Sequence, residues 1–94
     1  PYTTLFRSWA ELILRLVAED FPHFEQITGL RVLNRHMREG TNIKVELWMR
    51  LPRPAKPGGA TEEIAKRLEE IMRPFYPSLR DYDFVHKDFK ASKA

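Results

Sequence analysis

The strongest constraint on the fold lies in residues 43–50, which read I-K-V-E-L-W-M-R. Aliphatic residues occupy every second position, and Lys44, Glu46, Trp48 and Arg50 alternate with them. A period of two is typical of a strand with one face on a core and the other in water. Trp48 on the polar face is informative, because large aromatic side chains normally fill cores. Beside cations it suits a flat, anionic ligand such as a nucleotide; a tryptophan lying against a neighbouring strand or tail is the alternative.

The segments before this strand predict a helix and a second strand. Residues 9–21 place apolar side chains at the spacing of one helical stripe, and Pro22 is expected to end that helix. The predicted core stripe consists of Trp9, Leu12, Ile13, Leu16 and Val17. Residues 30–38 alternate like a strand, and turn-forming residues 39–42 join them to residues 43–50. The two strands are therefore expected to form an antiparallel hairpin.

The segments after the hairpin predict one more helix and one more strand. Residues 51–60 contain three prolines and two glycines, which favour neither helix nor sheet. Thr61 suits a helix N-cap, and an apolar stripe follows until Pro74 ends the helix. Residues 80–86 alternate again, with Asp81 and Asp83 on one face, where such carboxylates are usually solvated. The expected order is helix, strand, strand, helix, strand, an α+β fold.

Composition narrows the function classes. A chain of 94 residues has room for one domain, and it contains no cysteine and no apolar run near the roughly 18 residues of a membrane span. The three histidines lack metal-ligand spacing, and no phosphate-binding loop or nucleophile motif occurs. We therefore expect no metal, no cofactor and no enzymatic activity. The net charge of +3 permits an anionic partner without requiring one.

The first eight residues form a separate problem. Residues 1–8, P-Y-T-T-L-F-R-S, resemble one reading frame of a widely used sequencing adapter. Segments of this kind are set aside when a fold is predicted. The hypothesis is that residues 1–8 are a cloning artefact and that the native part of the chain starts at Trp9; a genuine helix start capped by Thr3 or Thr4 is the alternative.

Two groups of residues are candidate binding surfaces. Ala10 and Leu14 are helical neighbours outside the predicted core stripe, with Glu11 beside them, so they could dock a partner helix or be a lightly exposed apolar spot. In the hairpin, Arg35 and Arg38 are expected near Lys44. Clustered cations either bind an anion or form an ordinary solvated basic face.

Three stretches carry a resemblance to a known family. W-A-E-L-I-L-R-L-V-A-E-D-F, G-L-R-V-L-N-R and I-K-V-E-L-W, followed by a helix and a late aromatic strand ending in His86, resemble the C-terminal half of eukaryotic translation initiation factor 4E, the messenger RNA cap-binding protein. The resemblance covers residues 9 to about 88. It implies a curved antiparallel sheet with helices on its convex face, with residues 9–94 forming the C-terminal fragment of a single cap-binding domain. It also implies a cytoplasmic, monomeric protein that acts in translation initiation.

The resemblance assigns roles on the cap side. Arg35 and Lys44 resemble the residues that bind the cap phosphates, and Arg38 stands for another basic residue of that loop. Trp48 resembles the tryptophan that touches the methyl group of 7-methylguanosine. Glu46 departs from the family, which usually has a small residue there. The two tryptophans that sandwich the base and the glutamate that reads its edge have no counterpart in this chain.

The resemblance also assigns a partner surface. Ala10, Glu11 and Leu14 match the positions that meet the Tyr-x4-Leu-Φ helix of the 4G scaffold and of binding-protein repressors. Two other readings remain open. The chain could be a protein-interaction module or translational repressor of the same fold without cap binding, or an unrelated small basic α/β RNA-binding domain.

Overall fold

The computed structural model describes residues 2–37, 40–50, 52–53 and 58–86, which contain two helices and three strands in the predicted order. The helices are α1 (Tyr2–Val17) and α2 (Ala60–Met72), and the strands are β1 (Ile27–Met37), β2 (Gly40–Met49) and β3 (Tyr82–His86). A short 3-10 turn, η1 (Phe24–Gln26), leads into β1. The α+β class and the element order are confirmed.

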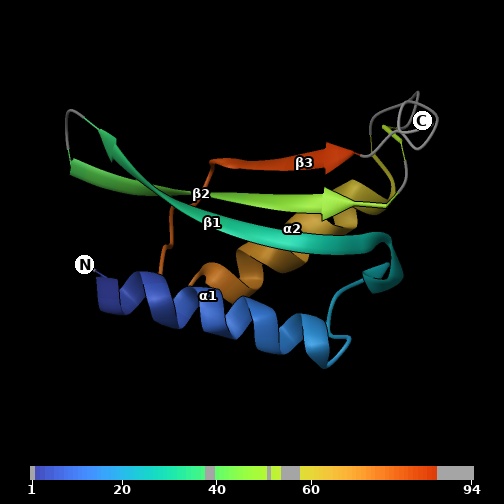
Figure 1. The fold of residues 1–94 in the computed structure, drawn as a ribbon, viewed down its shortest axis with the longest axis horizontal. Coiled ribbons are helices and arrows are strands. Elements are labelled where there is room, and N and C mark those ends of the chain that lie inside the picture. Colours follow the sequence, from blue (N-terminus) through green and yellow to red (C-terminus); the bar gives the residue numbers. More distant parts are fainter. Residues whose placement is uncertain (1, 38–39, 51, 54–57, 87–94) are drawn as a thin grey trace, which may run out of the picture.

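The sheet has the order β1-β2-β3, with β2 in the centre (Figure 1). β1 and β2 form the expected antiparallel hairpin, in which Val32 pairs with Val45. β3 instead runs parallel to β2, and Val45 pairs with Tyr82. The expectation of a wholly antiparallel sheet is therefore wrong. After β2 the chain crosses under the sheet through α2 and returns to the end of the sheet at which β2 begins. β3 starts from that end, so it runs in the same direction as β2.

Both helices cover the same face of the sheet, and the hairpin end of β1 and β2 bends away from them (Figure 1). The helices therefore lie on the convex side, as expected. The core between the layers contains the aliphatic face of β2 and the apolar stripe of α2. Its fully or almost fully buried members are Leu12, Phe21, Ile43, Val45, Leu47, Met49, Ile64, Leu68, Ile71, Met72 and Leu79.

α1 begins inside the segment that resembles an adapter. Leu5 packs against the core, and Ser8 is fully buried. The Ser8 hydroxyl donates to the Leu5 carbonyl oxygen at 2.8 Å, so the buried polar group has a partner. Leu5 and Ser8 therefore take part in the packing of this chain, and the origin of residues 1–8 remains a prediction.

α1 ends at Val17, not at Phe21 before the proline. Glu19 takes a left-handed conformation with φ of 59°. Its N–H donates to the Leu16 carbonyl oxygen at 3.0 Å, and the Asp20 N–H reaches back to the Arg15 carbonyl oxygen at 2.8 Å. These two bonds form a Schellman motif, which satisfies the last carbonyls of the helix before Pro22 is reached.

The core-facing side of α1 also differs from the prediction. Leu12 is buried and Leu5 and Leu16 pack against the core, whereas Trp9 is 40% exposed and Val17 is 77% exposed. A helix that starts seven residues before Trp9 contacts the core with a stripe beginning at Leu5. That stripe turns Trp9 and Val17 toward solvent. No helix in the described part of the chain is long and apolar enough to cross a membrane.

Candidate ligand face of the sheet and outer surface of the first helix

The face of the sheet turned away from the helices, which we call the open face, collects the predicted cap residues. Because Ile43, Val45 and Leu47 are buried, the residues between them on β2 point to the opposite side. The pairing registers add the corresponding residues of β1 and β3. The open face consists of Gly29, Arg31, Leu33, Arg35, Lys44, Glu46, Trp48, Asp83 and Val85.

Lys44 is the most enclosed cation of the open face. Its side chain is 22% exposed, and its Nζ lies 3.0 Å from an oxygen of Asp83 and 4.0 Å from an oxygen of Glu46. Glu46 is only 12% exposed and also accepts a bond of 3.0 Å from Arg31 Nε. Glu46 therefore points into the open face between two cations, which compensate its charge.

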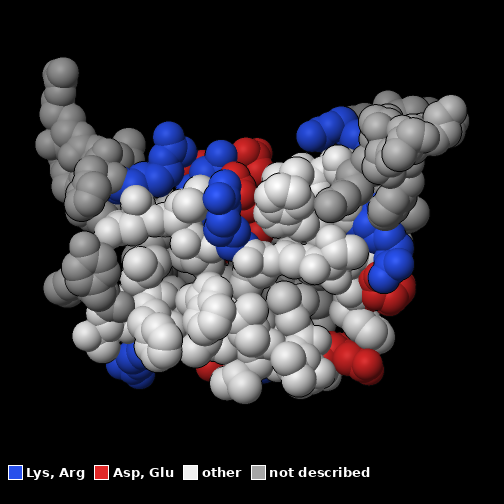
Figure 2. Space-filling model, viewed as in Figure 1, with Lys and Arg blue, Asp and Glu red and all other residues white. Residues whose placement is uncertain are grey.

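Arg35 has an acidic partner as well. Its guanidinium donates to an oxygen of Asp81, just before β3, at 2.8 Å. Arg31, Arg35 and Lys44 thus face Glu46, Asp81 and Asp83, and the two sets of charges balance. Figure 2 shows basic and acidic side chains gathered together along the top of the molecule, over this face. The expectation that Asp81 and Asp83 are merely solvated is wrong, because β3 lies beside β2 and brings them to the cations.

Trp48 lies on the open face, half-buried, opposite Gly29 of β1 and Val85 of β3. A Cβ added to Gly29 would lie 3.6 Å from the Trp48 Cβ, in ordinary van der Waals contact. The Trp48 backbone is held by the Thr28 hydroxyl, which donates to its carbonyl oxygen at 3.1 Å. The indole therefore sits on a fixed strand between two positions with small or medium side chains.

The structure brings Arg35, Lys44 and Trp48 to one face, as the sequence predicted. Arg38, the fourth predicted residue, lies outside the described residues. The sequence placed Glu46 on this face, but it did not reveal Asp81 and Asp83 as partners of the cations. The only signal for them was the placement of Asp81 and Asp83 at alternate positions of one strand.

The predicted partner surface lies on the outer side of α1. Leu14 is 63% exposed, and Ala10 and Glu11 are half-buried. Glu11 accepts a bond of 2.7 Å from Arg15 Nε. Phe6 is 66% exposed, and its ring centroid lies 6.1 Å from that of Trp9. These residues make the outer side of α1 an unusually apolar surface for a helix facing water.

A charge network fixes the position of α1 relative to α2. Asp20 accepts bonds from Arg15 at 2.8 Å and from Arg67 at 2.6 Å. The bonds from these two guanidinium groups hold the pKa of Asp20 below its usual value, with Arg15 as the larger cause. Arg67 also donates to the Asp20 carbonyl oxygen at 3.2 Å, so the end of α1 is tied to α2 by side chain and backbone.

Among the described residues, no cluster of histidine, aspartate and glutamate side chains could hold a metal ion. Comparison of the chain with protein-family models, with curated proteins and with solved structures gives no match. The assignment of function therefore rests on the geometry of the open face and of α1, together with the resemblance of the three sequence stretches.

Proposed function

We propose that the open face binds the 5′ cap of messenger RNA, 7-methylguanosine triphosphate, in a cytoplasmic protein of translation initiation. The observation that carries the proposal is the common placement of Arg35, Lys44 and Trp48 on the face of the sheet turned away from the two helices. Two cations suit a chain of phosphates, and an indole beside them suits the base. The proposal includes no enzymatic activity and no metal or cofactor.

The carboxylates of the open face define how such a ligand would bind. Asp81 and Asp83 neutralise Arg35 and Lys44 in the free chain, and both are at least one-third exposed. An incoming triphosphate would replace them as the partner of the cations. Because Arg35 and both carboxylates are more than one-third exposed, these are surface ion pairs, and breaking them costs about 0–1 kcal/mol each.

Fluorescence titration of this chain with 7-methylguanosine triphosphate and with guanosine triphosphate, at two salt concentrations, tests the proposal. The family residues that sandwich the base have no counterpart in this chain, so we expect weak, salt-sensitive binding of both ligands and no retention on 7-methylguanosine resin. Lys44→Ala should weaken both ligands by similar factors. Binding that is insensitive to salt and to Lys44→Ala would contradict the proposal.

Trp48 is tested separately, in a longer chain that supplies the base sandwich. There, Trp48→Ala should weaken the methylated ligand more than the unmethylated one, because stacking is worth roughly 1–3 kcal/mol per base. An unchanged preference for the methylated base would remove Trp48 from the proposed site.

A second candidate function is supported by the exposure of Leu14. As the resemblance implies, the outer side of α1 would bind a Tyr-x4-Leu-Φ helix of a scaffold or repressor through Ala10, Glu11 and Leu14. Calorimetry with such a peptide should show weaker binding for Leu14→Asp. Val17→Asp, a matched change at a more exposed position of the same helix, should leave the affinity unchanged. Equal effects of the two variants would argue against this surface.

A further inference from the structure

β1 is an edge strand, and the directions of its backbone groups can be deduced. The Val45 N–H donates to the Asp81 carbonyl oxygen at 3.0 Å, so the Val45 backbone faces β3. Val32 of β1 pairs with Val45, and this pair is therefore a non-hydrogen-bonded one. The N–H and C=O of Val32 point away from β2, toward the outer edge of the sheet. By alternation the same holds for Leu30 and Asn34. No strand of the described part pairs with this edge.

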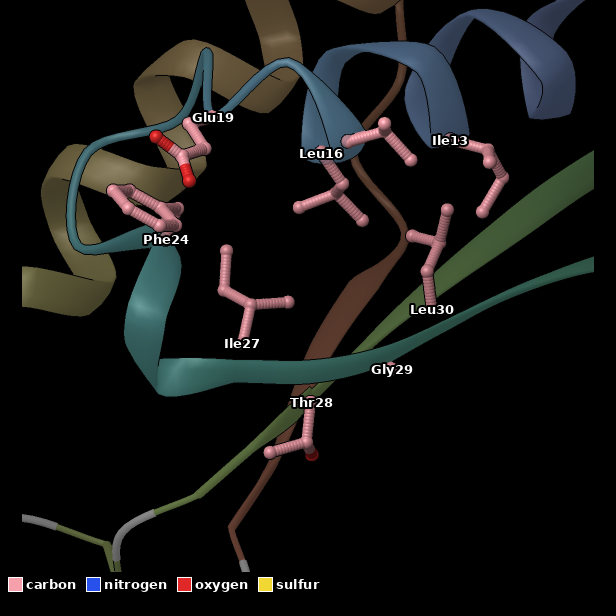
Figure 3. Close-up of a pocket in the computed structure, with 9 residues that line it drawn as sticks. Ile13, Leu16, Glu19, Phe24, Ile27, Thr28, Gly29 and Leu30 are labelled. Carbon is pink, nitrogen blue, oxygen red and sulfur yellow. The ribbon is translucent and has the colours of Figure 1, made fainter.

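A groove lined mainly by apolar side chains lies directly beneath the edge, between α1 and the first half of β1, and Glu19 contributes a carboxylate at one end. Figure 3 shows Ile13 and Leu16 of α1 facing Ile27 and Leu30 of β1 across it, with Phe24 at one end. Its volume is about 410 Å³, within the range of ligand-binding clefts. Figure 2 shows few charged side chains over α1 and the outer edge of β1, on the front of the molecule.

The charges of β1 indicate which kind of segment fits. β1 contains no aspartate or glutamate, and its exposed charged residues are Arg31 and Arg35, with side chains 58% and 53% exposed. Each forms one ion pair, but a guanidinium has five N–H donors and can accept a further anion. Two copies of β1 paired with each other would bring their arginines together, which disfavours a homodimer through this edge.

We propose that the outer edge of β1 binds an extended, acidic peptide segment as an additional antiparallel strand. Its residues opposite Leu30, Val32 and Asn34 would be hydrogen-bonded to the edge. Their apolar side chains would lie on the helix side of the sheet, and the one opposite Leu30 would lie over the groove. The intervening residues would be acidic and lie beside Arg31 and Arg35. This mode of recognition combines main-chain hydrogen bonds for affinity with alternate side chains for specificity. The site shares Arg35 with the proposed cap site, but strand addition does not require that the cap binds.

The test uses a synthetic heptapeptide in which glutamate alternates with leucine or valine, with blocked ends, titrated into this chain. Three versions are compared: unmodified, N-methylated at the apolar residues, and N-methylated at glutamates. In the antiparallel arrangement only the apolar residues direct their N–H groups at β1. Methylation there should weaken binding about tenfold or more, since several hydrogen bonds are lost, whereas methylated glutamates should cause little change. Equal effects of both modifications, or no binding of the unmodified peptide, would overturn the proposal.

Amide hydrogen exchange provides the second readout. In the free chain the amides of Leu30 and Val32 should exchange faster than that of Leu33, which faces β2. The peptide should slow exchange at Leu30, Val32 and Asn34. Protection confined to α1 would show that the peptide occupies a different surface and would contradict strand addition.

Paired variants separate the groove and the charges from folding effects. Val17 and Leu14 are both exposed on α1, but only Val17 lines the groove. Val17→Gln should reduce the affinity severalfold, and Leu14→Gln should not. Arg31→Gln should reduce both the affinity and its dependence on salt, whereas Arg73→Gln, an equal charge change beyond α2, should change neither. A greater loss of affinity in Leu14→Gln than in Val17→Gln, or in Arg73→Gln than in Arg31→Gln, would refute the assigned surface.

Discussion

Lys44 is held by carboxylates from two strands, and this pairing decides how the open face can respond to an anion. Glu46 lies on the same strand and is 12% exposed, whereas Asp83 comes from β3 and is 61% exposed. The buried carboxylate has Arg31 as a second partner, so it is compensated even when Lys44 turns away. The exposed carboxylate is therefore the one that a phosphate group displaces most easily.

Asp83→Asn should raise the affinity of the open face for guanosine triphosphate. The substitution removes a negative charge 3.0 Å from Lys44 Nζ, and a repulsion of ~1 kcal/mol corresponds to about a fivefold change. Glu70→Gln, which removes a charge from α2, is the control. Titration at low salt measures both, and equal affinities of the two variants would show that the ligand does not approach Lys44.

Glu19→Gly should stabilise the chain. Glu19 has φ of 59°, a conformation that costs a residue with a Cβ about 1 kcal/mol or more. The greater freedom of glycine in the unfolded chain offsets part of this, which leaves a gain of up to about 1 kcal/mol in the free energy of unfolding. Ala18→Gly, one residue earlier, should destabilise instead. Urea denaturation measures both, and a loss of stability in Glu19→Gly would show that the side chain contributes contacts of its own.

At the scale of elements, the two helices show what periodicity predicts. The buried stripe of α2 agrees with the sequence, because the spacing of its apolar residues and the proline after its end are local features. The predicted N-cap of α2, Thr61, is wrong. Gly59 takes the N-cap position with φ of 73°, and the Thr61 hydroxyl donates to the Gly58 carbonyl oxygen. In α1 both ends differ, because Leu5 packs against the core and the Schellman motif closes the helix early. Trp9 and Val17 fit the apolar spacing equally well, and only the contacts with the sheet turn them outward.

Asp20→Asn should reduce stability near neutral pH and make it less sensitive to acid. The pKa of Asp20 is lowered in the folded chain, so the folded state keeps this carboxylate ionised while the unfolded state takes up a proton. The contribution is present above the unfolded pKa of about 4 and is lost as the pH falls through the folded value. Urea denaturation between pH 2 and 7 should show a shallower decline for the variant. Parallel curves would contradict this role for the carboxylate.

Removal of residues 1–8 should lower the free energy of unfolding by about 1–3 kcal/mol, because Leu5 loses its packing on the core. Replacement of Thr3, an exposed residue of the same helix, by alanine is the control. An unchanged stability would show that the segment adds nothing to the fold. Its origin is tested independently by the genomic sequence upstream of the Trp9 codon: the octapeptide encoded there would exclude an adapter.

At the scale of the whole molecule, the central strand was predictable and the path of the chain was not. The alternation in residues 43–50 predicted the buried face of β2 and placed Lys44 and Trp48 on the other face. The direction of β3 depends on the route of α2 beneath the sheet, which no local pattern encodes. The ion pairs of Arg35 and Lys44 depend on the direction of β3, so the charge balance of the candidate site could not be predicted from the sequence either.

Leu47→Ala should lower the free energy of unfolding by about 2–5 kcal/mol, because Leu47 is fully buried in the strand that pairs with both neighbours. Leu14→Ala, at a residue that is 63% exposed, should change it by less than about 0.5 kcal/mol. Chemical denaturation measures both. Similar losses would mean that α1 contributes its outer side to the core.

The parallel strand β3 also sets an order of events during synthesis. Hairpin partners emerge from the ribosome together, but the partner of Val45 is Tyr82, which is made only after α2. Until then Arg35 and Lys44 have been translated and Asp81 and Asp83 have not. In the nascent chain Arg35 and Lys44 therefore lack the two carboxylates that the last strand brings to them.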